Sequence, residues 1–275
     1  MFFLRSPSAS SSAASSSNGA GQRSSRRELL WKLPLLAAGS FSSGAVAFGK
    51  SSEVSIATID HGEHALHRPT ALRRLMWDAK KRTALHTARE SEVLHFKSNS
   101  LFRYPLLCWT GQGKFTPLSQ EERRQLARYL RYGGMLWIDA PSSQDPFVQQ
   151  SIEEVEKALA QRFKALPKDH VLFKSFYLLD KAYGRTEDRY DGGPTGVRAL
   201  ELSKRVAAVV TTCDSLGAFA RDAFGTWSFE CHPNNRQQRE KAFRFGVNML
   251  MYATCLDYKA DQVHIPFILK KRRRR

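Results

Sequence analysis

The stretch that decides the fold is YPLLCWTGQGKFTPLSQEERRQLARYLRYGGMLWID, residues 104–139. It begins and ends in an almost wholly apolar run, and the segment between them carries apolar residues at helical spacing. Ser119 and Glu122 form a capping box that starts the helix, and Gly133 follows its last turn. A strand that is apolar at nearly every position is covered on both faces, as in a parallel sheet. The stretch therefore predicts a strand–helix–strand unit of the parallel type.

Short apolar runs alternate with amphipathic segments along the chain from residue 52 to residue 256. The predicted strands are 53–59, 92–96, 104–110, 135–139 and 205–213. The predicted helices start at Pro69, at Ser119, at a second capping box of Ser151 and Glu154, and near Arg236. Strands that alternate with helices indicate parallel βαβ units. We therefore expect an α/β domain with a doubly wound, mostly parallel sheet and helices on both faces, of flavodoxin-like type.

The chain of 275 residues carries a net charge of +17, which is unevenly distributed. The last six residues, KKRRRR, supply +6 and residues 1–47 supply +4, so that about +7 remains for the body. That excess is ordinary for a soluble domain, and no segment of the body alternates basic and aromatic residues. We therefore expect no nucleic-acid partner. The basic tail ends a C-terminal extension, 257–275, which either touches acidic lipid headgroups or another acidic polymer of the envelope, or is a frayed, solvated terminus.

Residues 1–47 have the composition of a targeting segment. A stretch rich in Ser, Ala and Gly, expected to be disordered, precedes SRRELL at 25–30, which matches a twin-arginine export motif. A short apolar run and an A-x-A cleavage signal at 45–47 follow it. The alternative is a disordered tail joined to an apolar first helix.

The order of motif, apolar run and cleavage signal predicts a bacterial protein that the twin-arginine translocase exports in the folded state. The protein would then be periplasmic or otherwise extracytoplasmic. An uncleaved signal would instead anchor it to the inner membrane. Contact with a membrane is expected only through this segment or the basic tail.

Ligands of parallel sheets bind beyond the carboxyl ends of the strands. Applied to the predicted strands, this rule selects the four loops that follow residues 59, 110, 138 and 213. We therefore expect a ligand-binding crevice formed by His61, Gly111, Gln112, Gly113, Asp139 and Asp214.

The first of these loops is rich in histidine. His61, Glu63, His64 and His67 fall within seven residues. Neutral imidazoles and a carboxylate suit a divalent metal such as zinc or nickel. Because Pro69 starts a helix, the segment before it is a loop. The alternative is therefore a solvated loop with one histidine hydrogen-bonded near the sheet edge. No other cofactor is predicted.

The other three loops each have a chemical and a structural interpretation. Asp139 ends a buried strand, so that it could act as a general base, a ligand anchor or a metal ligand, or cap the next turn. Asp214 could serve a ligand or cap a helix. The segment Gly111–Gly113 could present backbone N–H groups to an anion, or form a tight turn after its strand.

Four longer blocks of the sequence resemble a known family. The blocks are 68–83, 101–140, 167–177 and 239–253. In this order and spacing they are similar to domain of unknown function 4159, over nearly all of residues 52–256. That family is grouped with the class I glutamine-amidotransferase-like proteins. The resemblance therefore implies the same doubly wound fold that the pattern of strands and helices predicts.

The superfamily also implies a test for catalysis. Its amidotransferases place a nucleophilic cysteine directly after a central strand, with a distant His-x-Glu pair. Here the best-matching strand, 135–139, delivers Asp139 and then Ala140, and no H-x-E follows in the C-terminal third. An aspartate cannot supply the attacking thiolate, so we expect no amidotransferase activity. The family's usual GGDW-like loop is replaced here by DHGEHALH at 60–67.

Together these features predict an exported, non-catalytic ligand- or protein-binding module of the bacterial cell envelope. The alternative is a periplasmic hydrolase that uses Asp139 and the loop His61–His67, either with or without a metal ion.

Overall fold

The computed structural model describes residues 53–187 and 193–255. The predicted targeting segment at 1–47 and the predicted basic extension at 257–275 lie outside the described residues. None of the helices in the described ranges is both long and apolar enough to cross a membrane.

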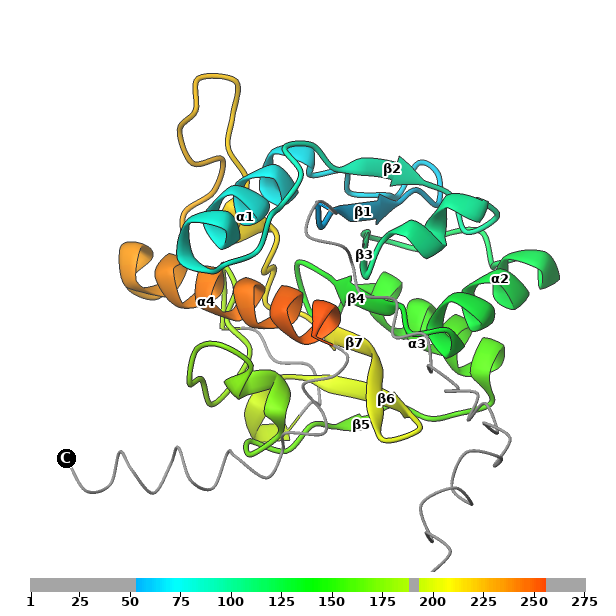
Figure 1. The fold of residues 1–275 in the computed structure, drawn as a ribbon. Coiled ribbons are helices and arrows are strands. Elements are labelled where there is room, and N and C mark those ends of the chain that lie inside the picture. The colour runs from blue at the N-terminus through cyan, green and yellow to red at the C-terminus, as the bar shows by residue number, and fades with distance from the viewer. Residues whose placement is uncertain (1–52, 188–192, 256–275) are drawn as a thin grey trace, which may run out of the picture. The chain divides into compact units, whose positions relative to one another are not determined.

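The described residues form a seven-stranded sheet with the strand order β2-β1-β3-β4-β7-β6-β5 (Figure 1). The strands are β1 Ile56–Ile59, β2 Glu92–Leu94, β3 Leu106–Thr110, β4 Met135–Asp139, β5 Lys164–Ala165, β6 Arg198–Leu202 and β7 Arg205–Thr211. The helices are α1 Pro69–Arg82, α2 Gln120–Arg131, α3 Pro146–Leu159 and α4 Asn235–Thr254. Short 3-10 turns are η1 Asn99–Arg103, η2 Val171–Lys174, η3 Gly193–Thr195 and η4 Gly217–Phe219.

Five strands of the sheet, β1, β2, β3, β4 and β7, are parallel to their neighbours in this group. All five were predicted from their apolar runs, and the predicted fold class is confirmed: an α/β fold with a doubly wound, mostly parallel sheet. Every residue of β3, β4 and β7 is buried, as expected for strands covered on both faces.

Alternate residues of the strands pack against helices on opposite faces of the sheet. Leu106 and Cys108 of β3 lie in one core cluster with residues of α1 and α4. Leu107 and Trp109 lie in a second cluster with residues of α2 and α3. This alternation is the period-two geometry of a strand, and Figure 1 shows the two pairs of helices on either side of the sheet.

The sequence analysis missed the antiparallel strands β5 and β6. β6 pairs with β7 across a tight turn at Ser203 and Lys204. Both turn residues have positive φ, 51° and 64°, the backbone geometry that favours Asn or Gly in two-residue hairpins. Because neither residue is Asn or Gly, the hairpin carries no turn signal in the sequence. β5 has only two residues, too few for a hydrophobic pattern.

The predicted start of α3 was wrong. The helix begins with Pro146, and the side chain of Asp145 caps it by accepting a hydrogen bond from the backbone of Phe147. Ser151 lies inside the helix and is buried. Glu154 is also buried and accepts a hydrogen bond from Arg123 of α2 at 2.7 Å. The two residues therefore belong to the packed face of α3 instead of forming a capping box.

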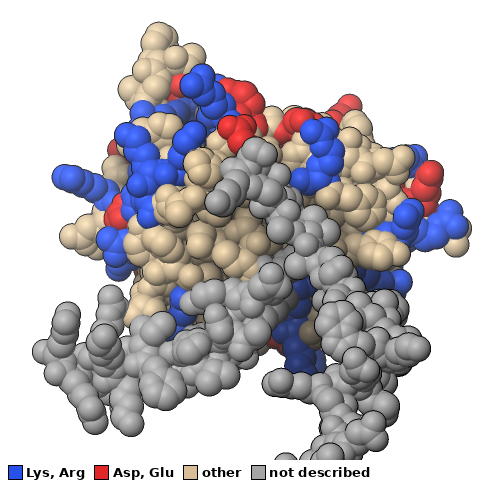
Figure 2. Space-filling model, in the orientation of Figure 1, with Lys and Arg blue, Asp and Glu red and all other residues tan. Residues whose placement is uncertain are grey.

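Basic side chains are numerous over α1 and α4, and others lie elsewhere on the face shown in Figure 2. In Figure 2, Lys and Arg cover much of the surface over α1 and the first turns of α4. The last turn of α1 carries Lys80, Lys81 and Arg82, and α4 carries Arg236, Arg239 and Arg244.

The turn between α2 and β4 depends on the buried hydroxyl of Tyr129. Its oxygen lies 3.0 Å from the carbonyl oxygens of Tyr104 and Met135, to which it can donate. It also accepts a hydrogen bond from the backbone N–H of Met135 at 3.1 Å. The ring leaves no space at Gly134, where an added Cβ would come within 2.2 Å of it. The hydroxyl therefore satisfies backbone groups that are buried where the chain enters β4.

We predict that Tyr129→Phe lowers the free energy of unfolding by about 1–3 kcal/mol, because it leaves buried backbone groups without their partner. The measurement is urea denaturation followed by circular dichroism. Tyr132→Phe is the matched control, since Tyr132 is 76% exposed, and should change stability by less than about 0.5 kcal/mol. Equal stability of the two variants would contradict this role of the Tyr129 hydroxyl.

Candidate functional site

The carboxyl ends of β4 and β7 lie side by side and carry the two acidic residues predicted at this edge. Asp139 of β4 is in register with Thr211 of β7. Beyond the strands, Ala140 donates its N–H to the carbonyl of Thr211 at 3.0 Å, and Asp214 donates its N–H to the carbonyl of Ala140 at 3.1 Å. The two loops therefore leave the sheet as a bonded pair.

Asp139 uses both carboxylate oxygens to hold the chain that follows β7. Oδ1 accepts hydrogen bonds from Thr211 Oγ1 at 2.7 Å and from the backbone N–H of Ser215 at 3.1 Å. Oδ2 accepts one from the N–H of Leu216 at 2.8 Å. Burial, followed by the charge of Asp214, raises the pKa of Asp139 to about 6. The buried carboxylate thus anchors a turn, and its two oxygens are already engaged.

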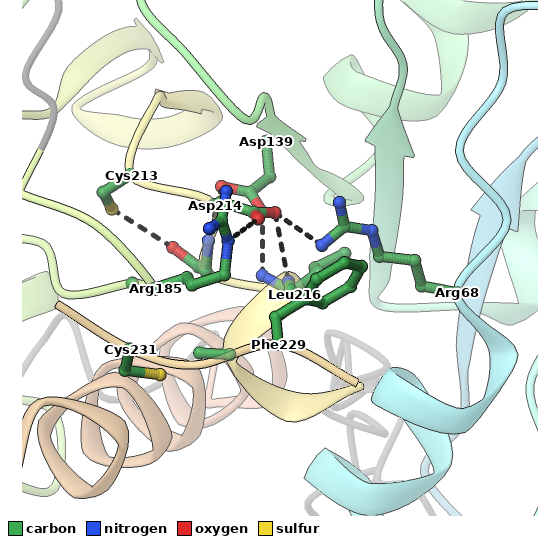
Figure 3. Close-up of polar contacts among 12 residues, drawn as sticks. Arg68, Asp139, Arg185, Cys213, Asp214, Leu216, Phe229 and Cys231 are labelled. Carbon is green, nitrogen blue, oxygen red and sulfur yellow. Dashed lines mark hydrogen bonds and ion pairs between the residues drawn. The ribbon is translucent and has the colours of Figure 1, made fainter. Parts of the chain in front are cut away.

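Asp214 is the residue that this turn positions. Its φ of 54° lies in the left-handed region, and its side chain is buried. Oδ1 accepts a hydrogen bond from Arg68 Nη1 at 2.5 Å, and Oδ2 accepts one from Arg185 Nε at 2.6 Å. One buried carboxylate therefore orients two guanidinium groups, as Figure 3 shows.

The two arginines come from segments that are distant in the sequence. Arg68 immediately precedes Pro69, the first residue of α1. Arg185 is brought in by a segment that pairs with the end of β7, because its N–H donates to the carbonyl of Asp214 at 3.1 Å. The ring of Phe229 packs against both, with its centroid 5.3 Å from the Arg68 guanidinium carbon and 5.5 Å from that of Arg185.

Two further contacts keep this arrangement tight. Gly217 allows close approach, since an added Cβ would come within 2.2 Å of both Arg68 Nη1 and Asp214 Oδ2. Arg239 of α4 donates from Nη1 to the carbonyl of Ala218 at 2.5 Å and from Nη2 to the carbonyl of Phe229 at 2.6 Å. These bonds fix to α4 both Ala218, which precedes the projecting 221–229 segment, and Phe229, which ends it.

The charge balance of the site favours an anionic ligand on its outer side. Both guanidinium groups share the single carboxylate of Asp214, through one N–H each. The described part of the chain supplies no other hydrogen-bond partner to either group. The Arg68 side chain is 13% exposed and the Arg185 side chain is 27% exposed, so each keeps a small contact with solvent beside the ring of Phe229. We define Arg68, Arg185, Asp214 and Phe229 as the arginine pair site.

The predicted crevice is filled on the side of the first loop. His61 lies against an aromatic cluster, with ring centroids 5.1 Å from Phe115 and 5.3 Å from Phe147. Its Nδ1 accepts a hydrogen bond from Trp109 Nε1 at 3.0 Å. Burial lowers the pKa of His61 to about 4, so the ring is neutral at pH 7. His61 is therefore a half-buried residue that packs on the aromatic cluster at the sheet edge.

The neighbouring glycine loop has a structural role. A Cβ at Gly111 would lie 2.7 Å from the rings of His61 and Phe147, so only glycine fits beside them. The N–H of Gln112 donates to the carbonyl of His64 at 3.0 Å, and the N–H of Gly113 donates to Asp145 Oδ1 at 2.7 Å. The amides of Gln112 and Gly113, for which binding of an anion was one of the two interpretations, are thus bonded within the protein.

The four predicted metal ligands do not converge. His61 is turned into the aromatic cluster, and His67 Nε2 lies 3.5 Å from Asp60. Glu63 and His64 are exposed. Within residues 53–187 and 193–255, no group of three His, Cys, Asp or Glu side chains is placed to hold a metal ion. The bond from Trp109 fixes the histidine nearest the sheet, and in this arrangement the four side chains do not form such a group.

A family model for a domain of unknown function, DUF4159, matches residues 55–254. The chain belongs to this family. No curated protein matches the sequence. The DUF4159 match spans every strand and helix described above, so the arginine pair site lies within the part of the chain that defines the family.

Of the four residues of the arginine pair site, only Asp214 was among the predicted site residues. Arg68 entered the sequence analysis only as the first residue of the family-like block at 68–83. Arg185 and Phe229 carry no signal of their own, because each depends on a loop folding back onto the end of β7.

The pKa of Asp139 gives a pH prediction. Because its folded-state pKa lies above the ordinary value of 3.8, the folded protein binds a proton more tightly than the unfolded chain does. The contribution to stability is complete below pH ~4 and is lost as pH rises through ~6. In urea unfolding, the wild type should therefore lose roughly 3 kcal/mol relative to Asp139→Asn between these pH values. Parallel pH profiles of the two proteins would contradict the raised pKa.

His61 acts in the opposite direction, and for this reason the variant is needed. Its folded-state pKa of about 4 lies below the ordinary value of 6.5. The unfolded chain then binds the proton more tightly, so stability falls as pH drops from ~6.5 to ~4. The two effects offset each other in the wild type, whereas the comparison with Asp139→Asn cancels the histidine contribution.

Proposed function

We propose that this DUF4159 protein is a non-catalytic binding module that recognises an anionic group, a carboxylate or a phosphate, at the arginine pair site. One observation carries the proposal: a single buried carboxylate, that of Asp214, orients the guanidinium groups of Arg68 and Arg185. Guanidinium groups held in a fixed orientation suit planar, charge-assisted recognition of carboxylate and phosphate.

The position of the site agrees with the general behaviour of parallel sheets. Arg68 follows β1, and Asp214 follows β7, so both lie beyond carboxyl ends of strands, where such sheets bind ligands. The acidic groups at the same edge are committed to structure. Asp139 accepts three hydrogen bonds, and Asp214 carries both arginines. This arrangement supports binding over acid–base catalysis, and the hydrolase alternative with Asp139 and His61–His67 has no converging set of groups.

We also propose that the domain is related to the class I glutamine-amidotransferase-like superfamily but lacks glutamine amidotransferase activity. The doubly wound sheet is compatible with that kinship. β4 ends in Asp139 and is followed by Ala140, so no thiol is available at the position where such enzymes carry their nucleophile.

Binding is tested with two probes, inorganic phosphate and succinate, by isothermal titration calorimetry at low ionic strength. We expect Arg185→Gln to weaken binding of the preferred probe about tenfold, since a charge-assisted hydrogen bond contributes roughly 1.5–3 kcal/mol. Arg162→Gln is the matched control, because Arg162 is a highly exposed arginine that pairs with Glu156. It should bind as the unaltered chain does.

A second variant separates recognition from folding. Arg185→Lys keeps a positive charge beside Asp214 but loses the planar fork of the guanidinium. It should fold with near-normal stability and still bind the probe several-fold more weakly. A folded Arg185→Lys or Arg185→Gln protein that binds both probes as tightly as the Arg162→Gln control would contradict the proposal.

We further propose that the protein is exported to the bacterial cell envelope by the twin-arginine translocase, using the motif at 25–30. The test fuses residues 1–50 to a reporter that folds in the cytoplasm. We expect export of the fusion and its loss when Arg26 and Arg27 are both changed to Lys. The substitution Arg5→Lys, which lies outside the motif, is the control and should leave export unchanged. Unimpaired export of the doubly changed fusion would rule out this route.

A further inference from the structure

We infer that the surface around α1, together with the neighbouring 221–229 loop, docks onto an anionic lipid bilayer. This surface adjoins the arginine pair site, to which the last residue of the loop, Phe229, belongs, and the inference rests on three observations. They are an exposed aromatic side chain at the tip of an ordered loop, basic side chains on both flanks of α1, and tryptophans stacked among these basic groups.

The first observation is the exposure of Phe224. It is 92% exposed, and the loop that carries it projects from the body beside α1 (Figure 1). An isolated exposed apolar residue is ordinary on a protein surface. Phe224 differs from such a residue because the folded loop holds its large aromatic ring in contact with water, at the tip of a projecting segment.

The loop is ordered by its own hydrogen bonds. Asp222 Oδ1 accepts from the N–H groups of Phe224 at 2.9 Å and Thr226 at 2.8 Å. Arg221 Nη1 donates to the carbonyl of Gly225 at 2.6 Å, and Gly225 has a φ of 79° that suits glycine. Arg221 and Trp227 form an antiparallel bridge at the base. The tip is therefore presented in a defined conformation.

The second observation is the charge on each side of α1. A groove of about 530 Å³ on one flank is lined by four basic residues and one acidic residue. They are Arg73, Lys80, Lys81, Arg89 and Glu90. A groove of about 620 Å³ between α1 and α4 is lined by five basic residues and two acidic ones. They are Arg74, Arg82, Arg236, Arg239, Arg244, Asp78 and Glu240. Both flanks therefore carry an excess of positive charge.

The third observation is the stacking of basic groups on tryptophan. Trp77 of α1 is 43% exposed. Its ring centroid lies 4.0 Å from the guanidinium carbon of Arg74 and 4.1 Å from Lys81 Nζ. The ring centroid of Trp227 lies 4.2 Å from the guanidinium carbons of both Arg221 and Arg239. Amphipathic aromatic rings beside basic side chains are the residues that favour the headgroup region of a bilayer.

The loop and α1 lie next to each other in the fold. The N–H of Arg221 donates to Thr70 Oγ1 of α1 at 3.2 Å, and Arg74 of α1 lies 5.8 Å from the ring of Trp227. Phe224 can then enter the apolar boundary while basic residues nearby meet anionic headgroups. A nucleic acid would instead stack its bases in a groove, whereas Phe224 stands at a convex tip. This contact extends the expected membrane contact beyond the targeting segment and the basic tail.

The test is co-sedimentation of the full chain with vesicles of phosphatidylcholine alone and of phosphatidylcholine with an equal amount of phosphatidylglycerol. We expect Phe224→Ser to lower the partition onto the mixed vesicles about tenfold, as loss of a buried phenyl ring requires. Tyr132→Ser, which removes an exposed aromatic at the end of α2, should leave it unchanged. Any contribution of the terminal segments is common to both variants.

A charge test uses a double variant and its matched control. Lys80→Gln with Lys81→Gln should lower the partition onto the mixed vesicles at least tenfold, because each basic residue near an anionic surface contributes about fivefold. Lys164→Gln with Lys168→Gln removes the same charge near the opposite edge of the sheet and should have little effect. Salt should weaken the binding of the unaltered chain.

Three results would overturn the inference. The first is equal partition of Phe224→Ser and Tyr132→Ser. The second is equal partition of the two double lysine variants. The third is binding of the chain to single-stranded oligothymidylate, lowered by the same substitutions, without binding to either kind of vesicle. That last result would assign the surface to nucleic acid.

Discussion

The buried carboxylate of Asp139 accepts hydrogen bonds from two backbone amides and thereby holds the turn after β7, on which the arginine pair site depends. An unpaired buried carboxylate is costly, and so are buried N–H groups without acceptors. At the end of β4 these two costs are relieved together, because the amides of Ser215 and Leu216 meet the carboxylate. The turn after β7 then has a single position. From that position Asp214 reaches Arg68 and Arg185.

The same constraint decides which chemistry the edge supports. A general base needs a free lone pair near its substrate. The carboxylate oxygens of Asp139 and Asp214 instead accept hydrogen bonds from other groups of the protein. His61 behaves similarly, since Trp109 donates to its Nδ1 and aromatic rings pack against its imidazole. Polar groups that the rule for parallel sheets selects are thus used to close the edge. Spare donors remain on the guanidiniums of Arg68 and Arg185, and on the buried Nε2 of His61, which has no hydrogen-bond partner among the described residues.

The sequence predicted what depends on local periodicity and failed where distant segments meet. The runs in β3, β4 and β7 are apolar because both faces are covered, so their place in a parallel sheet follows directly. The helix α2 was marked by Ser119 and Glu122, whose reciprocal bonds are present. The start of α3 was misplaced because Ser151 and Glu154 have cap spacing but lie on a buried face. The hairpin before β7 lacked Asn or Gly, and the pairing of Arg185 with Asp214 has no local pattern at all.

The local distribution of charge is a further property that the sequence did not predict, because it depends on how distant segments meet. The body has an ordinary excess of positive charge when it is counted along the chain, and that count gave no reason to expect an anionic surface as a partner. The fold changes the conclusion because it brings α1 and α4, which are far apart in sequence, side by side. Basic residues from both helices then share one groove, and Trp227 from a third segment lies among them. Net charge averages over the molecule, whereas an anionic partner responds to the local field, which decays within about 10 Å in salt. The relevant quantity is therefore the charge within one Debye length of α1, and only the three-dimensional arrangement supplies it.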